Sequence, residues 1–221
     1  MHRRALVTGG ARGIGRAIVE RLEVSGVEVV APARQDLDLQ YPESIDAFFS
    51  SNSTGFDILV NNAGINLPGK LVDYDVEDWR RIIEVDLTAP FLLSKAVAPK
   101  MIDQGWGRIV NVLSGFSFVS REGRGPYTAA KTGLLGLTRT LAIELAPHGI
   151  LVNGVSPGFV QTDLTVQNNS REQIDAIESA LPVGRLGQPS EIADAVEYLV
   201  SDRTTYMTGQ VLVLDGGFLL Q

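Results

Sequence analysis

Short runs of aliphatic residues alternate along the chain with longer stretches of helical periodicity. The runs are rich in Val, Ile and Leu and do not alternate with polar residues, a pattern typical of strands that are buried on both faces. Strands that alternate with helices indicate parallel βαβ units. We therefore expect an α/β fold, a doubly wound parallel sheet of the Rossmann type in a single domain, residues 1–221. The expected strands are residues 5–8, 27–31, 37–39, 58–60, 108–113, 151–155 and 211–214.

The helix after the first strand has the clearest pattern, whereas the connection after the second strand is too short for one. Ile14, Ile18 and Leu22 lie on one helical face, and Gly26 stands where that helix should end. The third expected strand begins at residue 37, only six positions after the second ends at residue 31. A helical crossover needs roughly ten or more residues. We predict that the helix between the second and third strands is missing.

Composition excludes several function classes. The 221 residues include 19 Lys+Arg and 26 Asp+Glu, a net charge of −7. This balance disfavours nucleic-acid and anionic-membrane partners, because both need a basic surface. The absence of cysteine excludes disulfides and thiolate chemistry, and with only His2 and His148 we expect no metal site and no serine–histidine triad. No apolar stretch approaches the ~20 residues of a membrane helix, so we expect a cytoplasmic protein without a membrane partner.

A glycine-rich segment, TGGARGIG from Thr8 to Gly15, lies between the first strand and the first helix. Gly9 permits a tight turn, while Gly13 and Gly15 let the backbone approach a pyrophosphate and let helix pack on strand. The unpaired N–H groups at the helix N-terminus favour phosphate. This context predicts dinucleotide binding, the alternative being a glycine turn without a ligand.

The end of the second strand bears on which dinucleotide binds. NAD-preferring folds usually place an acid there, whereas this chain has Ala33. Arg12 and Arg34 could instead hold a 2′-phosphate, which favours NADPH. In the alternative, both arginines are solvated and Asp36 binds the ribose of NAD.

Tyr127 and Lys131 are four residues apart in a strongly helical segment, so their side chains share one helix face. A free tyrosine has a pKa of ~10, and a single nearby cation lowers a pKa by ~1–3 units, so Lys131 alone falls short of bringing it to ~7. Ser114 follows a buried strand, at the sheet edge where α/β folds bind ligands. Together they predict acid–base chemistry on a carbonyl–alcohol pair. For Tyr127 alone, a half-buried aromatic beside a surface lysine would be the ordinary alternative.

These features together resemble the short-chain dehydrogenase/reductase family over nearly the whole chain. The matching motifs are the turn from Thr8 to Gly15, the NNAG element of Asn61 to Gly64, Ser114 with the YxxxK of Tyr127 and Lys131, Pro157–Gly158 with Thr162, and the closing Asp215–Gly216–Gly217. The resemblance implies hydride transfer between a nicotinamide cofactor and a carbonyl or alcohol.

By this resemblance, Tyr127 is the acid in reduction and the base in oxidation, Lys131 lowers its pKa and holds the nicotinamide ribose, and Ser114 orients the carbonyl. The expected cofactor is NADP, with NAD possible. The predicted cofactor-binding residues are Gly9, Arg12, Gly13, Ile14, Gly15, Arg34, Asp38, Asn62, Ala63, Gly64, Tyr127, Lys131, Pro157, Gly158, Val160 and Thr162.

Two departures from the family pattern stand out. The family usually has an asparagine where this chain has Asp86, and that residue anchors a water leading to Lys131. We include Asp86 among the catalytic residues and expect retuned or reduced activity, since its charge could pair with Lys131; in the alternative, the aspartate is simply tolerated. The shortened connection after the second strand should leave the adenine end of the cofactor more open.

The sequence is most similar in phrasing to 3-oxoacyl-[acyl-carrier-protein] reductases, which makes a 3-oxoacyl thioester the first expected substrate and an acyl carrier protein a possible partner. A basic residue expected before the catalytic strand is absent around Gln104–Trp106. Arg121 and Arg124 could replace it, the alternative being a solvated loop. Sugars, polyols and other small ketones stay open as substrates, as does a nonenzymatic dinucleotide-binding role. Residues 163–185 are expected to form the substrate lid.

Oligomerisation, as a tetramer or dimer, is implied by the family resemblance. Two long helices, residues 78–102 and 127–146, are expected to form one interface, and the C-terminal strand region another. The apolar C-terminal residues 218–220 would be buried against a neighbour or packed within the chain.

Overall fold

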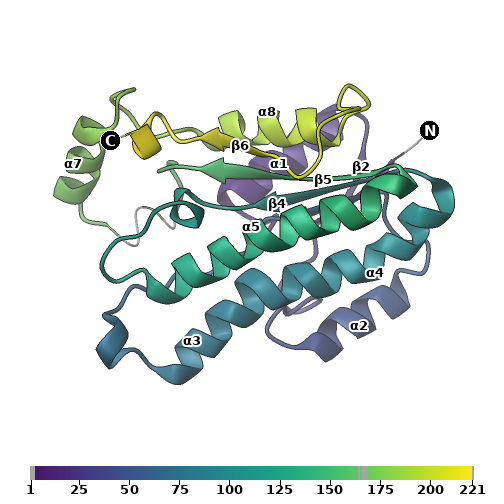
Figure 1. Ribbon diagram of the computed structural model, residues 1–221, viewed down its shortest axis with the longest axis horizontal. Helices are drawn as coiled ribbons and strands as arrows, with labels where there is room; N and C mark the ends of the chain where they lie inside the picture. The colour runs from purple at the N-terminus through teal and green to yellow at the C-terminus, as the bar shows by residue number, and fades with distance from the viewer. Residues whose placement is uncertain (1–2, 164, 166–168, 221) are drawn as a thin grey trace.

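The computed structural model describes residues 3–163, 165 and 169–220. Their strands form one six-stranded parallel sheet in the order β2-β1-β3-β4-β5-β6 (Figure 1). The strands are β1 (Arg4–Val7), β2 (Glu28–Val30), β3 (Ile58–Asn61), β4 (Gly107–Val112), β5 (Ile150–Pro157) and β6 (Val211–Leu214). The order reverses between β1 and β3, the switch point at which such sheets bind ligands. The expected α/β, doubly wound, single-domain fold is confirmed.

Helices cover both faces of this sheet. On one face α1 (Gly13–Val24) packs against α8 (Pro189–Val200); on the other, α4 (Ala89–Gln104) and α5 (Gly125–Leu145) lie side by side, with α2 (Pro42–Ser51) against α4 (Figure 1). Alternate strand residues enter the two resulting cores: Leu6 and Leu59 face α4, and Val7 and Val60 face α1 and α8. Since both faces are covered, no strand position needs to be polar, which explains the unbroken aliphatic runs.

The expected strand at residues 37–39 is wrong. The chain turns there instead, with the Asp36 and Leu37 amides donating to the Ala33 carbonyl at 2.9 and 3.0 Å. Leu37 and Leu39 are buried in the core beneath α2 and α4, so their hydrophobicity reflects packing and not a ladder of strand hydrogen bonds. Residues 31–41 contain no helix, as expected. Because residues 37–39 form no strand, however, the next strand of the sheet is β3, and α2 lies between β2 and β3; the predicted absence of a helix between the second and third strands is therefore wrong.

The long helix expected at residues 78–102 is interrupted. Helix α3 (Val76–Ile83) leads into a π-helical turn, Glu84–Thr88, before α4 begins at Ala89. Such turns often occur at functional sites because they redirect side chains. Here the turn contains Asp86, which is fully buried.

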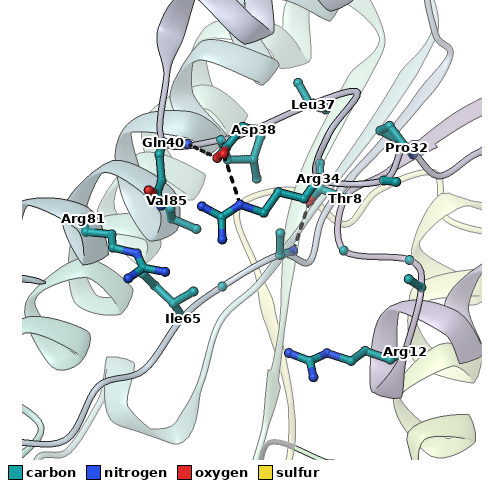
Figure 2. A pocket seen from close by; sticks show the side chains of 17 residues that line it. Thr8, Arg12, Pro32, Arg34, Leu37, Asp38, Gln40, Ile65, Arg81 and Val85 are labelled. Atoms are coloured by element: carbon teal, nitrogen blue, oxygen red, sulfur yellow. Dashed lines mark hydrogen bonds and ion pairs between the residues drawn. The ribbon is translucent and has the colours of Figure 1, made fainter.

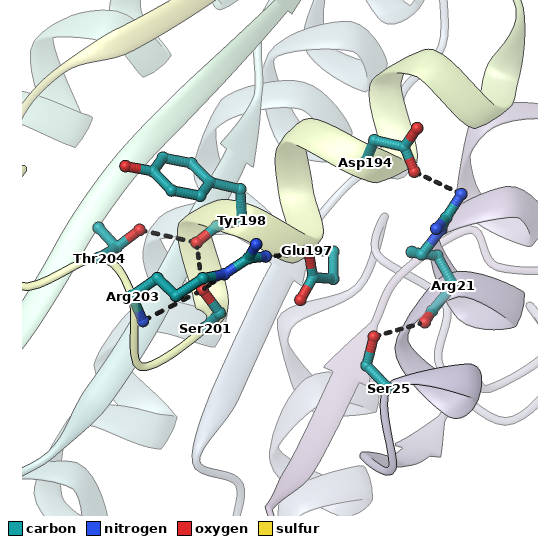
Figure 3. A network of polar contacts seen from close by, with 8 residues as sticks. All are labelled: Arg21, Ser25, Asp194, Glu197, Tyr198, Ser201, Arg203 and Thr204. Carbon is teal, nitrogen blue, oxygen red and sulfur yellow. Dashed lines mark hydrogen bonds and ion pairs between the residues drawn. The ribbon is translucent and has the colours of Figure 1, made fainter.

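Polar contacts join α1 to α8 on the opposite face (Figure 3). Arg21 of α1 pairs with Asp194 of α8, and beyond the end of α8 the hydroxyls of Ser201 and Thr204 donate to the Tyr198 carbonyl at 2.8 and 2.7 Å. The Arg21–Asp194 pair ties α1, whose N-terminus opens onto the site described below, to α8, while the other two bonds close the end of α8. In the described part of the chain, no helix has the length and apolar character needed to cross a membrane.

Candidate active site

A continuous cleft follows the carboxyl ends of β1, β3, β4 and β5. Its central part is bounded by the glycine turn after β1, by Ala63 and Gly64 after β3, by Ser114 after β4 and by Pro157–Gly158 of β5. The cleft continues into an adenosine-side pocket at one end and into a small substrate-side pocket at the other, since each shares lining residues with the centre. Parallel strands thus bring together residues that are far apart in sequence.

The glycine turn has the shape of a phosphate cradle. Gly9 and Gly13 have φ values of 65° and 54°, a left-handed conformation that favours glycine. A Cβ at Gly15 would lie 2.1 Å from the Gly9 carbonyl oxygen, so no side chain fits there. Helix α1 begins at Gly13 without a side-chain cap and without an acid in its first turn. Its N-terminal N–H groups therefore face the cleft, where they fit the pyrophosphate of a dinucleotide.

Hydrogen bonds fix this cradle to the NNAG element. The Thr8 hydroxyl accepts from the Asn62 and Ala63 amides at 3.1 and 3.0 Å, and the Asn62 side chain donates to the Thr8 carbonyl at 2.9 Å. The role of Asn62 in the described structure is to hold two loops together.

Three arginines surround the adenosine-side pocket (Figure 2). Arg34 pairs with Asp38 at 3.1 Å. With its amide oxygen turned toward the arginines, Gln40 accepts from Arg34 Nη2 at 2.9 Å and from Arg81 Nε at 3.1 Å. Arg12 reaches in from the glycine turn. The pocket is thus rich in donors for an anionic group such as a 2′-phosphate.

Sequence reasoning missed Arg81, which comes from α3. The available signal was its spacing: Arg81 lies four residues before Val85, one helical turn away, and both line this pocket. Gln40 was missed as well, because a residue in a short irregular loop has no periodicity that would predict where its side chain points.

Ser114, Tyr127 and Lys131 all line the central cleft, where β4 ends and α5 begins. A chain of buried hydrogen bonds holds β3, β4 and α5 in register. The Asn61 side chain donates to Asn111, which donates to the Thr138 hydroxyl of α5, both at 2.8 Å. The Ser114 hydroxyl accepts from the Phe116 amide at 3.3 Å.

Lys131 and Asp86 form a buried ion pair behind the tyrosine. Lys131 Nζ lies 3.4 Å from Asp86 Oδ2 and donates to the Val112 carbonyl at 3.1 Å. The Ile65 amide donates to the other carboxylate oxygen of Asp86 at 2.8 Å. A Cβ at Gly64 would lie 3.0 Å from Asp86 Oδ2, so this glycine leaves room for the pair.

Burial and this ion pair together shift the pKa values of Tyr127, Lys131 and Asp86. Burial raises the pKa of Tyr127; Lys131 acts in the opposite direction, and the Asp86 charge raises it further. Burial opposes the charged form of Lys131, but Asp86 and Tyr127 outweigh it and raise the lysine pKa. Burial also raises the pKa of Asp86, despite the lysine. Tyr127 is therefore protonated at neutral pH. The lowering effect of Lys131 alone does not bring the tyrosine pKa to near neutrality, in agreement with the sequence-based expectation.

The substrate-side pocket encloses about 100 Å³. Three phenyl rings line it, with Phe218 at 6.3 Å from Phe116 and 5.3 Å from Phe159, centroid to centroid. Phe218 thus packs within the chain, the second of the two arrangements open from the sequence, while Leu220 is exposed. Tyr127 and Ser114 form the boundary with the central cleft.

Arg124 also lines this pocket. Both interpretations open from the sequence, a solvated loop residue and a surface contact for a carrier protein, are therefore wrong for Arg124. It is 7% exposed, and its Nη1 has no hydrogen-bond partner among the described residues. Arg121 is exposed, as is His148 near the far end of α5.

The other predicted site residues lie as follows. Gly158, Pro157 and Thr162 line the central cleft, but the side chain of Val160 is buried in the core between the sheet and α8. In the expected lid, Thr165 and Asn169 line the substrate-side pocket and α7 (Arg171–Ala180) follows. Residues 164 and 166–168 of that lid lie outside the described residues, as does His2.

Comparison with known proteins gives a consistent result. A family model described as enoyl-(acyl carrier protein) reductase matches residues 33–219. The 3-oxoacyl-[acyl-carrier-protein] reductase of Vibrio cholerae is 40% identical over 237 residues, which cover 98% of this chain and 97% of the relative. Its counterpart from Aquifex aeolicus is 39% identical, with 96% of each chain covered.

Among solved structures, a putative NAD(P)-dependent gluconate 5-dehydrogenase from Beutenbergia cavernae with bound NADP superposes with a TM-score of 0.95. It is 33% identical, with 99% of this chain and 97% of that chain covered. A 4-hydroxyisoleucine dehydrogenase complexed with NADH has a TM-score of 0.95 at 28% identity, with 100% of each chain covered. The chain belongs to the short-chain dehydrogenase/reductase family of oxidoreductases.

Proposed function

We propose that this protein is an NADP-dependent reductase of 3-oxoacyl thioesters. The convergence of Ser114, Tyr127 and Lys131 on the cleft that contains the glycine cradle carries the proposal. The substrate class is supported by the curated relatives, which are 3-oxoacyl-[acyl-carrier-protein] reductases at about 40% identity over nearly the whole chain.

The cofactor would lie along the cleft with its pyrophosphate at the N-terminus of α1. Arg12 and Arg34 would hold a 2′-phosphate, and the absence of an acid at Ala33 leaves room for it. NAD remains the alternative, because no charge here excludes a free ribose. When bound, the nicotinamide supplies the hydride that the substrate carbonyl carbon accepts.

The residues of the chain supply the proton and the orientation. Ser114 would donate to the carbonyl oxygen, which positions it beside the Tyr127 hydroxyl. Because the pKa of Tyr127 is raised by burial, the tyrosine carries the proton that the forming alkoxide needs. Lys131, held by Asp86 and Val112, stabilises the tyrosinate that results.

The assembly and the lid belong to the proposal too. Residues 163–185 would cover the substrate, as supported by Thr165 and Asn169 at the pocket. We propose a cytoplasmic homotetramer that packs through the α4 and α5 faces, where Phe91 and Ile143 are exposed, and that accepts substrates from an acyl carrier protein.

A second candidate function, dehydrogenation of a small hydroxy acid or sugar acid, is favoured by Arg124 in the substrate-side pocket and by the gluconate dehydrogenase among the structural neighbours.

The test is NADPH oxidation with acetoacetyl-CoA, with NADH in parallel and with Tyr127→Phe beside the wild type. Turnover that disappears in Tyr127→Phe is the expected result. Failure to turn over the thioester, despite measurable NADPH binding, would exclude this substrate class.

A further inference from the structure

The substrate-side pocket contains a buried cation that the described residues do not neutralise. Arg124 is 7% exposed, and its guanidinium makes no hydrogen bond or ion pair within the part of the chain that the structure describes. The neighbouring acid Glu122 does not compensate it, because Glu122 pairs with Lys70 at 3.3 Å. No Asp or Glu stands among the described residues that line the pocket.

An unpaired buried guanidinium is unusual, because burial removes the hydration of the charge without replacing it. Burial and the like charge of Arg121 both lower the pKa of Arg124, yet arginine stays protonated in proteins. Among the described residues, two weak contacts offset this cost: the Phe116 ring, 5.8 Å from the guanidinium carbon, and Tyr127, which acts to raise the pKa of Arg124. An anionic ligand would neutralise this charge.

Arg124 is also placed to act on the reacting substrate. It directly precedes Gly125, the first residue of α5, and lies three residues before Tyr127, one helical turn away. The two side chains influence each other's charge and line the same pocket. A substrate whose carbonyl meets Tyr127 and Ser114 therefore places its neighbouring atoms at Arg124.

A second polar atom in the pocket lacks a partner. The Oδ1 of Asn66 is buried without a hydrogen-bond donor among the described residues. The pocket thus offers a free cationic donor and a free acceptor around a cavity of about 100 Å³. A cavity of this size has room for the body of a small acid.

We infer that Arg124 binds a free carboxylate of the substrate, so that the pocket takes short oxo and hydroxy acids. The inference rests on the second candidate function, oxidoreduction of a small acid, and names the residue that would bind the carboxylate of that acid. A guanidinium pairs with a carboxylate through two parallel hydrogen bonds, which the neutral carbonyl of a thioester cannot match.

The experiment compares three probes with NADPH: acetoacetate, acetoacetyl-CoA and the neutral ketone 4-hydroxy-2-butanone. The variants are Arg124→Gln, which removes the charge, and Arg124→Lys, which keeps the charge but cannot form two parallel hydrogen bonds to a carboxylate. Arg203→Gln is the control, an exposed arginine beyond the end of α8 that pairs with Glu197 and does not line the pocket.

We expect Arg124→Gln to lower kcat/KM for acetoacetate by about 10- to 100-fold, mainly through KM, as for loss of a hydrogen bond to a charged group. The neutral ketone should be unaffected, Arg124→Lys should restore part of the acid activity, and Arg203→Gln should behave as wild type. An equal loss for all three probes would overturn the inference, because it would mean that Arg124 acts on Tyr127 instead.

The experiment separates failure of this inference from failure of the proposed thioester function. If acetoacetyl-CoA alone is turned over and Arg124→Gln leaves it unchanged, the inference is wrong and the thioester function stands. If none of the probes is turned over, thermal unfolding of the NADP-loaded protein with 3-hydroxybutyrate decides. A rise in Tm that is lost in Arg124→Gln supports the carboxylate site, and no rise overturns it.

Discussion

The two ends of the cleft hold their charges in opposite ways. At the reacting end, Lys131 and Asp86 expose 4% and 0% of their side chains and lie 3.4 Å apart. At the adenosine end, Arg34 exposes 65% of its side chain beside Asp38 at 3.1 Å. Solvent screens the second pair and not the first. The buried pair therefore sets protonation states, while the exposed one leaves a cation available to a ligand.

This difference predicts how each end responds to substitution. Changes at the buried end should alter turnover, pH dependence and folding together, because the same contacts serve all three. Changes at the exposed end should alter ligand affinity alone and depend on salt.

The largest effect is expected for Tyr127→Phe. The phenylalanine keeps the ring that packs against Phe116 at 6.3 Å but has no proton to transfer. Turnover should fall by about 10²- to 10⁴-fold, the usual contribution of a positioned general acid. Measured NADPH binding should stay within a factor of about two, since binding depends mainly on the glycine cradle and the adenosine-side pocket, which the substitution leaves intact. Retained turnover would mean that a different group donates the proton.

Asp86→Asn should separate stability from chemistry at the buried end. The asparagine still accepts from the Ile65 amide but leaves Lys131 without its counter-charge, which should cost about 3 kcal/mol of unfolding free energy in urea titrations. The Asp86 charge raises the pKa of Tyr127, so its removal lowers that pKa. In alcohol oxidation, where Tyr127 must be deprotonated, the rising limb of the pH–rate profile should move to lower pH.

A matched control for that substitution is Asp38→Asn, which removes the exposed partner of Arg34. It should leave the pH profile unchanged and barely affect stability. If the pH–rate profile of Asp86→Asn does not move, the charges of Asp86 and Lys131 are not coupled to the tyrosine.

The sequence predicted most of the sheet and the meeting of Tyr127 and Lys131 in one cleft, because both follow from local patterns. Buried parallel strands appear as unbroken aliphatic runs, and Tyr127 and Lys131 are linked by helical spacing. Sequence patterns predict less well the side chains whose environment depends on tertiary packing. Arg124 looks like a loop residue in sequence, and only the packing of Phe116 and α5 makes it buried.

Residues 37–39 show the opposite error. Leu37 and Leu39 are as hydrophobic as strand residues, but they fill the core from a turn. Alternation over three residues cannot distinguish the two, since the distinction lies in hydrogen bonds to a neighbouring strand.

At the exposed end, Ala33→Asp should shift preference toward NADH. A carboxylate at the end of β2 would repel a 2′-phosphate held by Arg34 and would accept from a ribose hydroxyl. We expect the ratio of kcat/KM values, NADPH to NADH, to fall by about 10-fold or more, as for one unfavourable charge contact. Unfolding in urea should be unchanged. An unaltered ratio would place the 2′-phosphate elsewhere.

The smallest effect is expected for Arg81→Gln. Arg81 shares the Gln40 acceptor with Arg34, so it steadies the loop between β2 and α2 and adds positive charge to the pocket. We expect a two- to five-fold weaker affinity for 2′,5′-ADP by calorimetry, about the size of one screened charge contact, with 5′-AMP unaffected. Arg80→Gln is the control, since Arg80 is exposed and pairs with Glu77. The difference between the two variants should shrink at high salt, as it must if the adenosine end acts through exposed charge. Equal weakening of 2′,5′-ADP and 5′-AMP would instead show that Arg81 shapes the adenine pocket and does not bind the phosphate.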